Sequence, residues 1–190
     1  MKKLLASCAL LALASIPAQA ATFQNAVTTG GTVVEDFSGA GIISFDIDFA
    51  NLAPVTLNYE IDADDNGSPI TFSSVIRNFT GSGIDTLVFT LSMSNFASVG
   101  SVTTFNANAI VTLNGEGNVA SISFPGSEYL DVFVGNPTGE LGRIDWTINS
   151  NALRSGDLLS ITAAVPEPET YAMLLAGLGL IGAAARRRKA

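Results

Sequence analysis

The sequence contains no histidine, and its single cysteine is Cys8. Structural and catalytic zinc sites use mainly histidine and cysteine ligands, and a Ser-His-Asp triad needs a histidine as its base. Beyond Cys8 the chain therefore has no thiol nucleophile, no histidine-dependent triad and no means of forming a disulfide. A domain built from the central residues must be stabilised by packing alone, even in an oxidising compartment.

Basic residues are also scarce in the centre of the chain. Between residues 21 and 165 the cations are Arg77, Arg143 and Arg154, set against fifteen aspartates and glutamates, so the formal charge there is 3 − 15 = −12, compared with −8 for the whole chain. Such a domain repels nucleic acid and anionic membrane surfaces, so we expect no nucleic-acid partner. Its plausible charged partners are metal cations and basic surfaces.

The first twenty residues have the pattern of a signal peptide. A pair of lysines precedes an apolar run over residues 4–14, and a small-residue motif follows at Ala18 and Ala20. This order is typical of a secretory signal that signal peptidase removes. We predict a signal peptide over residues 1–20, cleavage before Ala21, and export through the inner membrane.

The last 26 residues, 165–190, form a second targeting segment. Pro166-Glu167-Pro168 precedes an uncharged, mainly apolar run over residues 170–185, and Arg186, Arg187, Arg188 and Lys189 follow. The two prolines favour an extended, accessible stretch. As a helix, residues 170–185 would be roughly 24 Å long, close to the thickness of a bilayer core, and the basic cluster should stay cytoplasmic. We predict a transmembrane helix at about 170–185 with a basic tail at 186–189.

This three-part order resembles the PEP-CTERM sorting signal of Gram-negative bacteria. The resemblance implies that an exosortase, a membrane-embedded cysteine protease, recognises the tail and removes it, so that the protein is transiently membrane-anchored and then reaches the cell surface or the extracellular space. It also implies a link to exopolysaccharide and to biofilm or floc formation. It covers the tail only and implies nothing about the fold of residues 21–164.

Residues 21–164 alternate between apolar and polar positions with a period of two, and they show no sustained helical pattern. Glycine- and asparagine-rich turns separate the runs. We predict a single all-β domain, an antiparallel β-sandwich of jelly-roll or Ig-like topology. The apolar positions of the runs are Ile43-Phe45-Ile47-Phe49, Val55-Leu57-Tyr59-Ile61, Leu87-Phe89-Leu91-Met93, Ala109-Val111-Leu113, Ala120-Ile122-Phe124, Leu130-Val132-Val134, Ile144-Trp146-Ile148 and Leu159-Ile161-Ala163.

Two local features refine this prediction. Residues 114–118, with the sequence Asn-Gly-Glu-Gly-Asn, lie between two alternating runs and predict a β-hairpin turn. Residues 99–108 are rich in serine, threonine, asparagine and alanine, and they fit either a polar edge strand or a loop.

The best candidate for a metal site is Asp62-Ala63-Asp64-Asp65-Asn66-Gly67, in which Asp62, Asp64 and Asn66 match the opening of a calcium-binding loop. Oxygen ligands at alternate positions suit a hard cation, and the glycine permits the sharp turn. The twelfth position, however, is Ser73 rather than glutamate, and the flanks read as strands. An ordinary turn explains the same residues and is favoured, so Ca²⁺ is the one cofactor the sequence leaves open.

Two other groups could carry function. Asp46 and Asp48 lie on one face of a strand, roughly 7 Å apart, and paired carboxylates can hydrolyse glycosides. A solvent-facing position without chemistry is the favoured interpretation. Tyr59, Tyr129 and Trp146 could form a platform for a sugar, but Tyr59 and Trp146 are in phase with their apolar neighbours, so packing in the core is the expected role.

The sequence therefore predicts an exported, exosortase-processed protein of the envelope or extracellular matrix, with no catalytic residues. The alternative is a carbohydrate-binding or calcium-stabilised adhesin module. A carboxylate-based glycosidase is the least favoured function.

Overall fold

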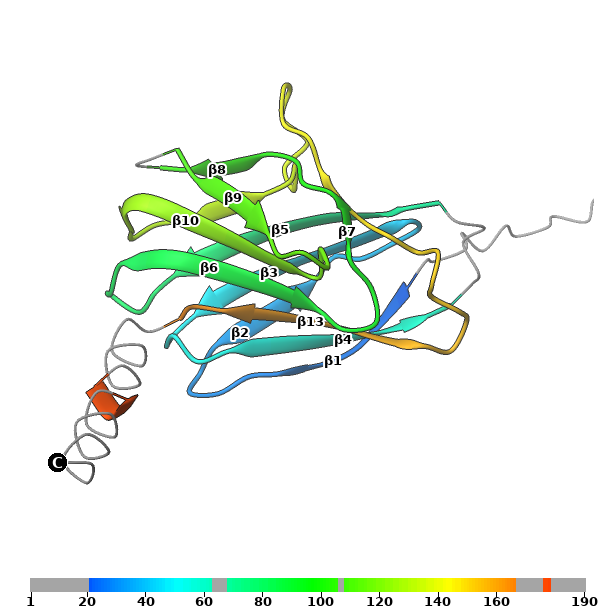
Figure 1. Ribbon diagram of the computed structural model, residues 1–190, viewed down its shortest axis with the longest axis horizontal. Helices are drawn as coiled ribbons and strands as arrows, with labels where there is room; N and C mark the ends of the chain where they lie inside the picture. The colour runs from blue at the N-terminus through cyan, green and yellow to red at the C-terminus, as the bar shows by residue number, and fades with distance from the viewer. Residues whose placement is uncertain (1–20, 63–67, 106–107, 167–175, 179–190) are drawn as a thin grey trace, which may run out of the picture.

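The computed structural model describes residues 21–62, 68–105, 108–166 and 176–178. These residues form two β-sheets that pack face to face, and the only helical residues among them are 176–178 (Figure 1). None of the described helices is long and apolar enough to cross a membrane. The predicted signal peptide lies outside the described residues, and so does the predicted membrane helix apart from residues 176–178.

The first sheet has six strands in the order β1-β4-β13-β6-β10-β9, and each neighbouring pair is antiparallel. The chain visits this sheet repeatedly, so its neighbours come from distant parts of the sequence. Its strands are β1 (Ala21–Val27), β4 (Val55–Ile61), β6 (Ile84–Leu91), β9 (Ile110–Leu113), β10 (Val119–Glu128) and β13 (Leu158–Ala164).

The second sheet has seven strands and is arranged around a single central strand, β5. Its main order is β2-β3-β5-β11-β8, while β12 pairs with both β5 and β7. Its strands are β2 (Val33–Asp36), β3 (Ile42–Phe49), β5 (Ile70–Asn78), β7 (Phe96–Ser98), β8 (Val102–Thr104), β11 (Val132–Val134) and β12 (Trp146–Ile148).

The prediction of an all-β fold is confirmed, but the prediction that all strands pair in antiparallel fashion is wrong for one pair of strands. β3 and β5 run parallel over their whole length, from Ile42 opposite Thr71 to Phe49 opposite Asn78. The chain leaves β3, crosses the other sheet as β4, and returns as β5 in the original direction. The alternation of apolar and polar residues cannot predict such a crossover. It shows which face of the sheet each side chain occupies, but not which strands are neighbours.

Most of the apolar positions that the sequence predicted fill the space between the sheets. In β3 the four apolar residues 43, 45, 47 and 49 are fully buried, and in β4 residues 55, 57, 59 and 61 are at most 2% exposed. Aromatic rings join the two sheets, since Phe89 of β6 lies 5.5 Å from Phe72 of β5 and 6.5 Å from Trp146 of β12 between ring centroids. Tilted and edge-on ring pairs of this kind stabilise a core beyond the area they bury.

The alternation is a weaker guide at the ends of strands. Met93, Leu130 and Ile144 are in phase with buried neighbours, yet they are 60%, 46% and 67% exposed. Each was predicted to lie in a strand, but the observed strand ends before that residue or begins after it. The predictions for these three residues are wrong for that reason. The prediction for Leu113 is also wrong, because it ends the edge strand β9 and is 40% exposed.

The predicted hairpin at residues 114–118 is confirmed between β9 and β10. The backbone N–H of Asn114 donates to the carbonyl of Val119 over 3.0 Å, and the side chain of Asn114 accepts a hydrogen bond from the Val119 N–H. Gly117 has a φ of 73°, a conformation that favours glycine. Within residues 99–108, the edge-strand interpretation holds for β8, which pairs with β11.

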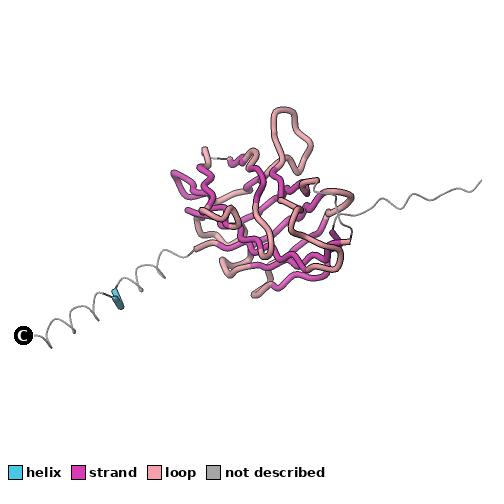
Figure 2. Tube along the Cα trace, turned by 45° about the vertical axis from the view of Figure 1, so that its right-hand side comes forward, coloured by secondary structure: helices cyan, strands magenta, loops and turns pink. Residues whose placement is uncertain are grey.

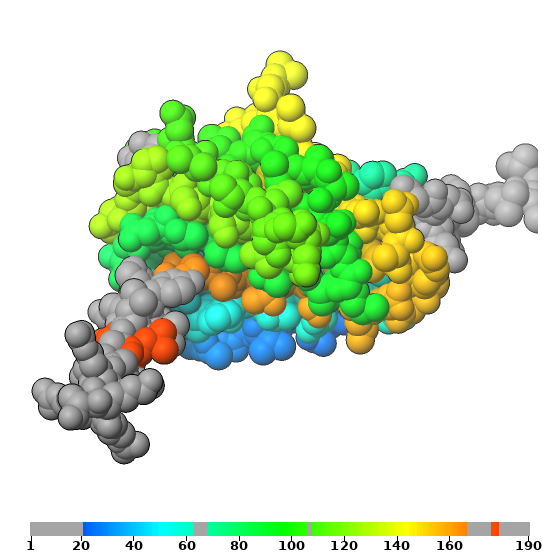
Figure 3. Space-filling view, in the orientation of Figure 1, coloured from blue at the N-terminus to red at the C-terminus, as the bar shows by residue number. Residues whose placement is uncertain are grey.

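The start of β1, where the described chain begins, and the end of β13, where the chain leaves the sheets, lie at opposite ends of the domain. Ala21 of β1 is opposite Ile61, and Ala163 of β13 is opposite Val55, so the length of β4, roughly 20 Å, separates them. Figure 2 shows the strands of the two packed sheets from a second direction. Residues 135–145, between β11 and β12, project from the body of the domain (yellow in Figure 3).

Candidate functional site

The predicted calcium loop falls mainly on residues that the structure does not describe, including Asp64 and Asn66. Asp62 is described, and its carboxylate accepts a hydrogen bond from the hydroxyl of Thr22 on β1. Within the described part of the chain, no three histidine, cysteine, aspartate or glutamate side chains lie close enough to hold a metal ion. Calcium binding stays a prediction.

Asp46 and Asp48 form an ion-paired cluster with Arg77 on the outer face of the second sheet. Arg77 lies on β5 directly opposite Asp48 of the parallel strand β3. One guanidinium nitrogen, Nη1, donates to Asp48 over 2.7 Å, and the other, Nη2, donates to Asp46. The hydrogen bond to Asp48 is the main reason why the pKa of Arg77 is raised. Both carboxylates therefore face a permanent cation.

This cluster changes the interpretation of the carboxylate pair. The side chain of Asp46 is only 12% exposed and that of Asp48 is 35% exposed, so the expected solvent-facing position is correct for Asp48 and wrong for Asp46. A glycosidase needs one carboxyl that holds a proton at working pH. Asp46 and Asp48 instead each accept a charge-assisted hydrogen bond from the guanidinium of Arg77.

We expect Arg77→Ala to destabilise the domain by about 2 kcal/mol. Removing one partner of a fully buried ion pair costs about 3–5 kcal/mol, and the 31% exposure of the Arg77 side chain reduces that penalty. Urea unfolding at neutral pH measures the change. In an Asp46→Ala, Asp48→Ala background the same substitution should cost less than about 0.5 kcal/mol, and an equal cost in both backgrounds would contradict the pairing.

The three aromatic residues do not form a sugar platform. Tyr59 and Trp146 are fully buried, whereas Tyr129 is 54% exposed. The Tyr59 hydroxyl donates to Asp36 over 3.0 Å, and its burial raises the pKa of Tyr59. The Trp146 indole N–H donates to the carbonyl of Ser101 over 3.1 Å. The expected core role of Tyr59 and Trp146 is confirmed.

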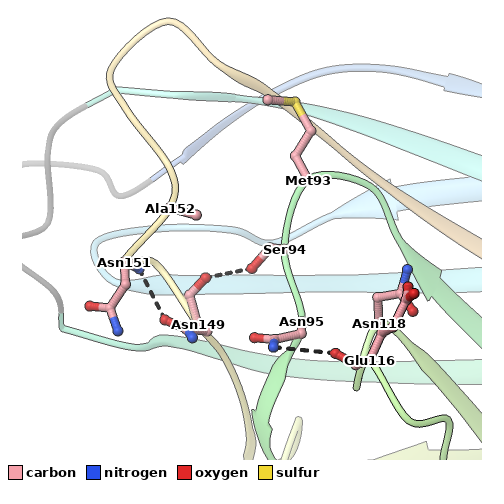
Figure 4. A pocket seen from close by; sticks show the side chains of 8 residues that line it. All are labelled: Met93, Ser94, Asn95, Glu116, Asn118, Asn149, Asn151 and Ala152. Carbon is pink, nitrogen blue, oxygen red and sulfur yellow. Dashed lines mark hydrogen bonds between the residues drawn. The ribbon is translucent and has the colours of Figure 1, made fainter.

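A polar hollow that the sequence did not predict lies where three loops meet (Figure 4). It has a volume of about 370 Å³, and most of its lining residues carry amide or hydroxyl groups, although apolar atoms make up most of its exposed wall. The lining residues come from the loop after β6, the β9–β10 hairpin and the segment after β12: Met93, Ser94, Asn95, Glu116, Asn118, Asn149, Asn151 and Ala152.

Backbone hydrogen bonds hold these three loops together. The N–H of Asn149 donates to the carbonyl of Asn95 over 2.9 Å, and the N–H of Phe96 donates to the carbonyl of Gly117 over 2.8 Å. The Ser94 hydroxyl donates to the backbone carbonyl of Asn149. Each loop reads in sequence as an ordinary polar turn, and only the tertiary structure brings them to one place.

The two predicted targeting segments adjoin the first and the last strand of the domain. Ala21, which follows the predicted signal-peptide cleavage site, is the first residue of β1 and is buried. Ala164 ends β13, Val165 is 7% exposed and Pro166 is half-buried. The other predicted sorting and cleavage residues lie outside the described residues: Ala18, Ala20, Glu167, Pro168, Arg186, Arg187 and Arg188.

Comparison with known protein families finds a PEP-CTERM protein-sorting motif at residues 164–189. The rest of the chain matches no family. No curated protein and no solved structure shows significant similarity to the chain. The motif confirms the predicted sorting signal and identifies the chain as an exported protein that is a target of an exosortase.

Proposed function

We propose that the β domain acts as a non-enzymatic component of the cell envelope or extracellular matrix, associated with exopolysaccharide or biofilm. A membrane helix at about 170–185 anchors it for a time, and an exosortase then cuts the tail. The match at residues 164–189 carries this proposal. The two packed sheets support a β-sandwich, for which jelly-roll and Ig-like topologies remain the two alternatives.

The surface around the exit of the tail supports a position beside a membrane. The pairing of β13 with β4 and of β3 with β5 places the loops at 28–32, 50–54 and 79–83 at the end where the chain leaves β13. None of these three loops contains a charged residue, although the domain as a whole is strongly acidic. These three loops bring no carboxylate to an anionic bilayer surface, which would repel it, although the turn between β10 and β11 at the same end contains Asp131.

A non-enzymatic role is favoured by the arrangement of the carboxylates. Asp46 and Asp48, the pair that the sequence marks as a candidate for glycoside hydrolysis, are both ion-paired with Arg77. The alternative function, a carbohydrate-binding or calcium-stabilised adhesin, loses the support of the aromatic platform, because Trp146 is buried.

Replacing Pro166-Glu167-Pro168 with three alanines is expected to abolish processing. In a host that contains the exosortase, the variant should accumulate as a membrane-held form that retains the sorting tail, because the extended segment before the membrane is lost. Membrane fractionation and the mass of the released product measure this result. Pro137→Ala in the projecting segment is the matched control and should be processed normally, as should the unaltered chain.

A host without the exosortase should hold the unaltered chain in the membrane as well. Release of the alanine variant at the normal rate and with the normal mass would contradict the assignment of Pro166-Glu167-Pro168 as the recognition segment.

A further inference from the structure

We propose that the hollow between the β6–β7 loop, the β9–β10 hairpin and the segment after β12 is a binding site for an uncharged saccharide. The inference goes beyond sorting and does not depend on it. It rests on the chemistry of the lining, on the way the loops are fixed, on the backbone conformation of Met93, and on the place of the hollow in the domain.

The lining is suited to hydroxyl groups rather than to ions. Asn95, Asn118, Asn149 and Asn151 supply amides. Within the protein, the Asn95 amide donates one hydrogen bond, and the amide oxygens of Asn118 and Asn149 accept one each. A side-chain amide can make up to four hydrogen bonds and both donates and accepts, as sugar hydroxyls do. The lining contains no arginine or lysine, and its one charged side chain is that of Glu116, so it is unsuited to a phosphate, sulfate or uronate group.

The hollow also offers apolar contact, which a saccharide needs for the C–H face of its ring. The Met93 side chain is 60% exposed and lies at one side of the hollow, and the methyl group of Ala152 lies nearby (Figure 4). A small number of convergent polar groups beside apolar surface is the usual composition of a small-molecule site, and about 370 Å³ falls within the usual range of about 300–1,000 Å³.

The site is fixed before any ligand arrives. Backbone hydrogen bonds join Asn149 to Asn95 and Phe96 to Gly117, and a third joins Leu91 to Asn118 over 2.8 Å. Loops held in this way lose little conformational entropy on binding, which favours affinity.

Met93 supports a functional role for the hollow through its backbone. Its φ is 57°, and among the described residues it is the only one other than glycine with a positive φ. A side chain in this left-handed region is strained, and such strain is concentrated at functional sites. Glycine would fit the backbone better, but it would remove the apolar group from the hollow.

The hollow lies away from the sorting tail. The N–H of Ser92 donates to the carbonyl of Ser160 near the start of β13, and the chain then runs along β13 to Ala164, where the sorting motif begins. A domain anchored through that tail presents the hollow on the side opposite its anchor. This orientation rests on the proposed function, whereas binding itself does not.

The test uses the full chain purified in a zwitterionic detergent that contains no sugar. Calorimetric titration with neutral gluco-, galacto- and manno-oligosaccharides, and with an oligouronate for comparison, should give saturable binding of at least one neutral oligosaccharide and none of the uronate. Asn151→Ala should weaken that binding about fivefold to tenfold, the effect of losing one neutral hydrogen bond. Asn25→Ala, an exposed asparagine on β1, is the matched control and should leave it unchanged.

Met93→Gly separates binding from folding. The melting temperature should stay the same or rise, because glycine adopts a positive φ without strain, while the dissociation constant should increase. The proposal is overturned if no neutral oligosaccharide binds, if the oligouronate binds as well as the neutral ones, or if Asn151→Ala and Met93→Gly both bind normally. A failure of the sorting assignment would appear instead as normal processing of the Pro166-Glu167-Pro168 variant.

Discussion

A chain that ends at Leu158 is expected not to fold, whereas a chain that ends at Pro166 should melt at the same temperature as the domain of the full protein. The reason is the place of β13, which lies inside the first sheet and pairs with β4 on one side and with β6 on the other. Removing it separates the sheet into two parts and leaves two strand edges without partners.

The apolar contribution of β13 is large in comparison with the stability of a small domain. Leu159, Ile161 and Ala163 are fully buried, and Val165 just beyond the strand is 7% exposed. Burying one leucine or isoleucine side chain is worth about 1.5–3 kcal/mol, so the first two residues alone supply about 3–6 kcal/mol. Typical domains are stable by about 5–15 kcal/mol in total.

Circular dichroism and thermal melts of the two truncated chains measure this effect. A cooperative transition in the chain that ends at Leu158 would contradict the central role of β13, and a lower melting temperature for the chain that ends at Pro166 would show that later residues contribute to the fold. The expected result also restricts processing. An exosortase can remove the sorting signal without damaging the domain only if it cuts after Val165.

The strands that the sequence predicted well are those with one face on the core and one face outside. β3, β4 and β13 read as clean alternations because their polar residues lie on the outer faces of the two sheets. Their apolar residues therefore identify most of the core from periodicity alone.

β5, the strand around which the second sheet is arranged, was not predicted. Residues 72–76 are all buried, and they include Ser73 and Ser74, so the segment shows neither alternation nor a continuous apolar run. The Ser73 hydroxyl donates to the hydroxyl of Ser44 on the parallel neighbour β3 over 3.1 Å. A strand enclosed on both faces does not need a polar face, and for that reason periodicity fails there.

The candidate sites show the same limit. The sorting motif is contiguous, so the sequence was sufficient to identify it. The Arg77 cluster depends on the parallel pairing of β3 with β5, and the polar hollow depends on the meeting of three turns. Contacts between distant segments leave no local pattern, and the sequence therefore named Asp46 and Asp48 without their partner.

The second large effect is expected for Trp146→Ala, which should destabilise the domain by about 3–5 kcal/mol. The indole packs against Phe96, Phe72 and Phe89 with centroid distances of 5.4, 6.1 and 6.5 Å, so these contacts reach β5 and β7 of its own sheet as well as β6 of the other. Its N–H also donates to the carbonyl of Ser101. The substitution removes these contacts and leaves a cavity between the sheets.

Urea unfolding followed by circular dichroism measures the loss, and two further variants interpret it. Trp146→Phe retains much of the ring packing and should cost about 1–3 kcal/mol, through the change of shape and the lost hydrogen bond. Tyr129→Ala, which removes an exposed ring of the same predicted platform, should change stability by less than about 0.5 kcal/mol. If Trp146→Ala destabilised the domain as little as Tyr129→Ala, the indole would not be part of the core. The aromatic residues could then again be considered as a sugar-binding platform. If the large loss is found, a Trp146 variant that no longer binds a saccharide reports unfolding rather than recognition, and the hollow has to be tested through its own residues, Met93 and Asn151.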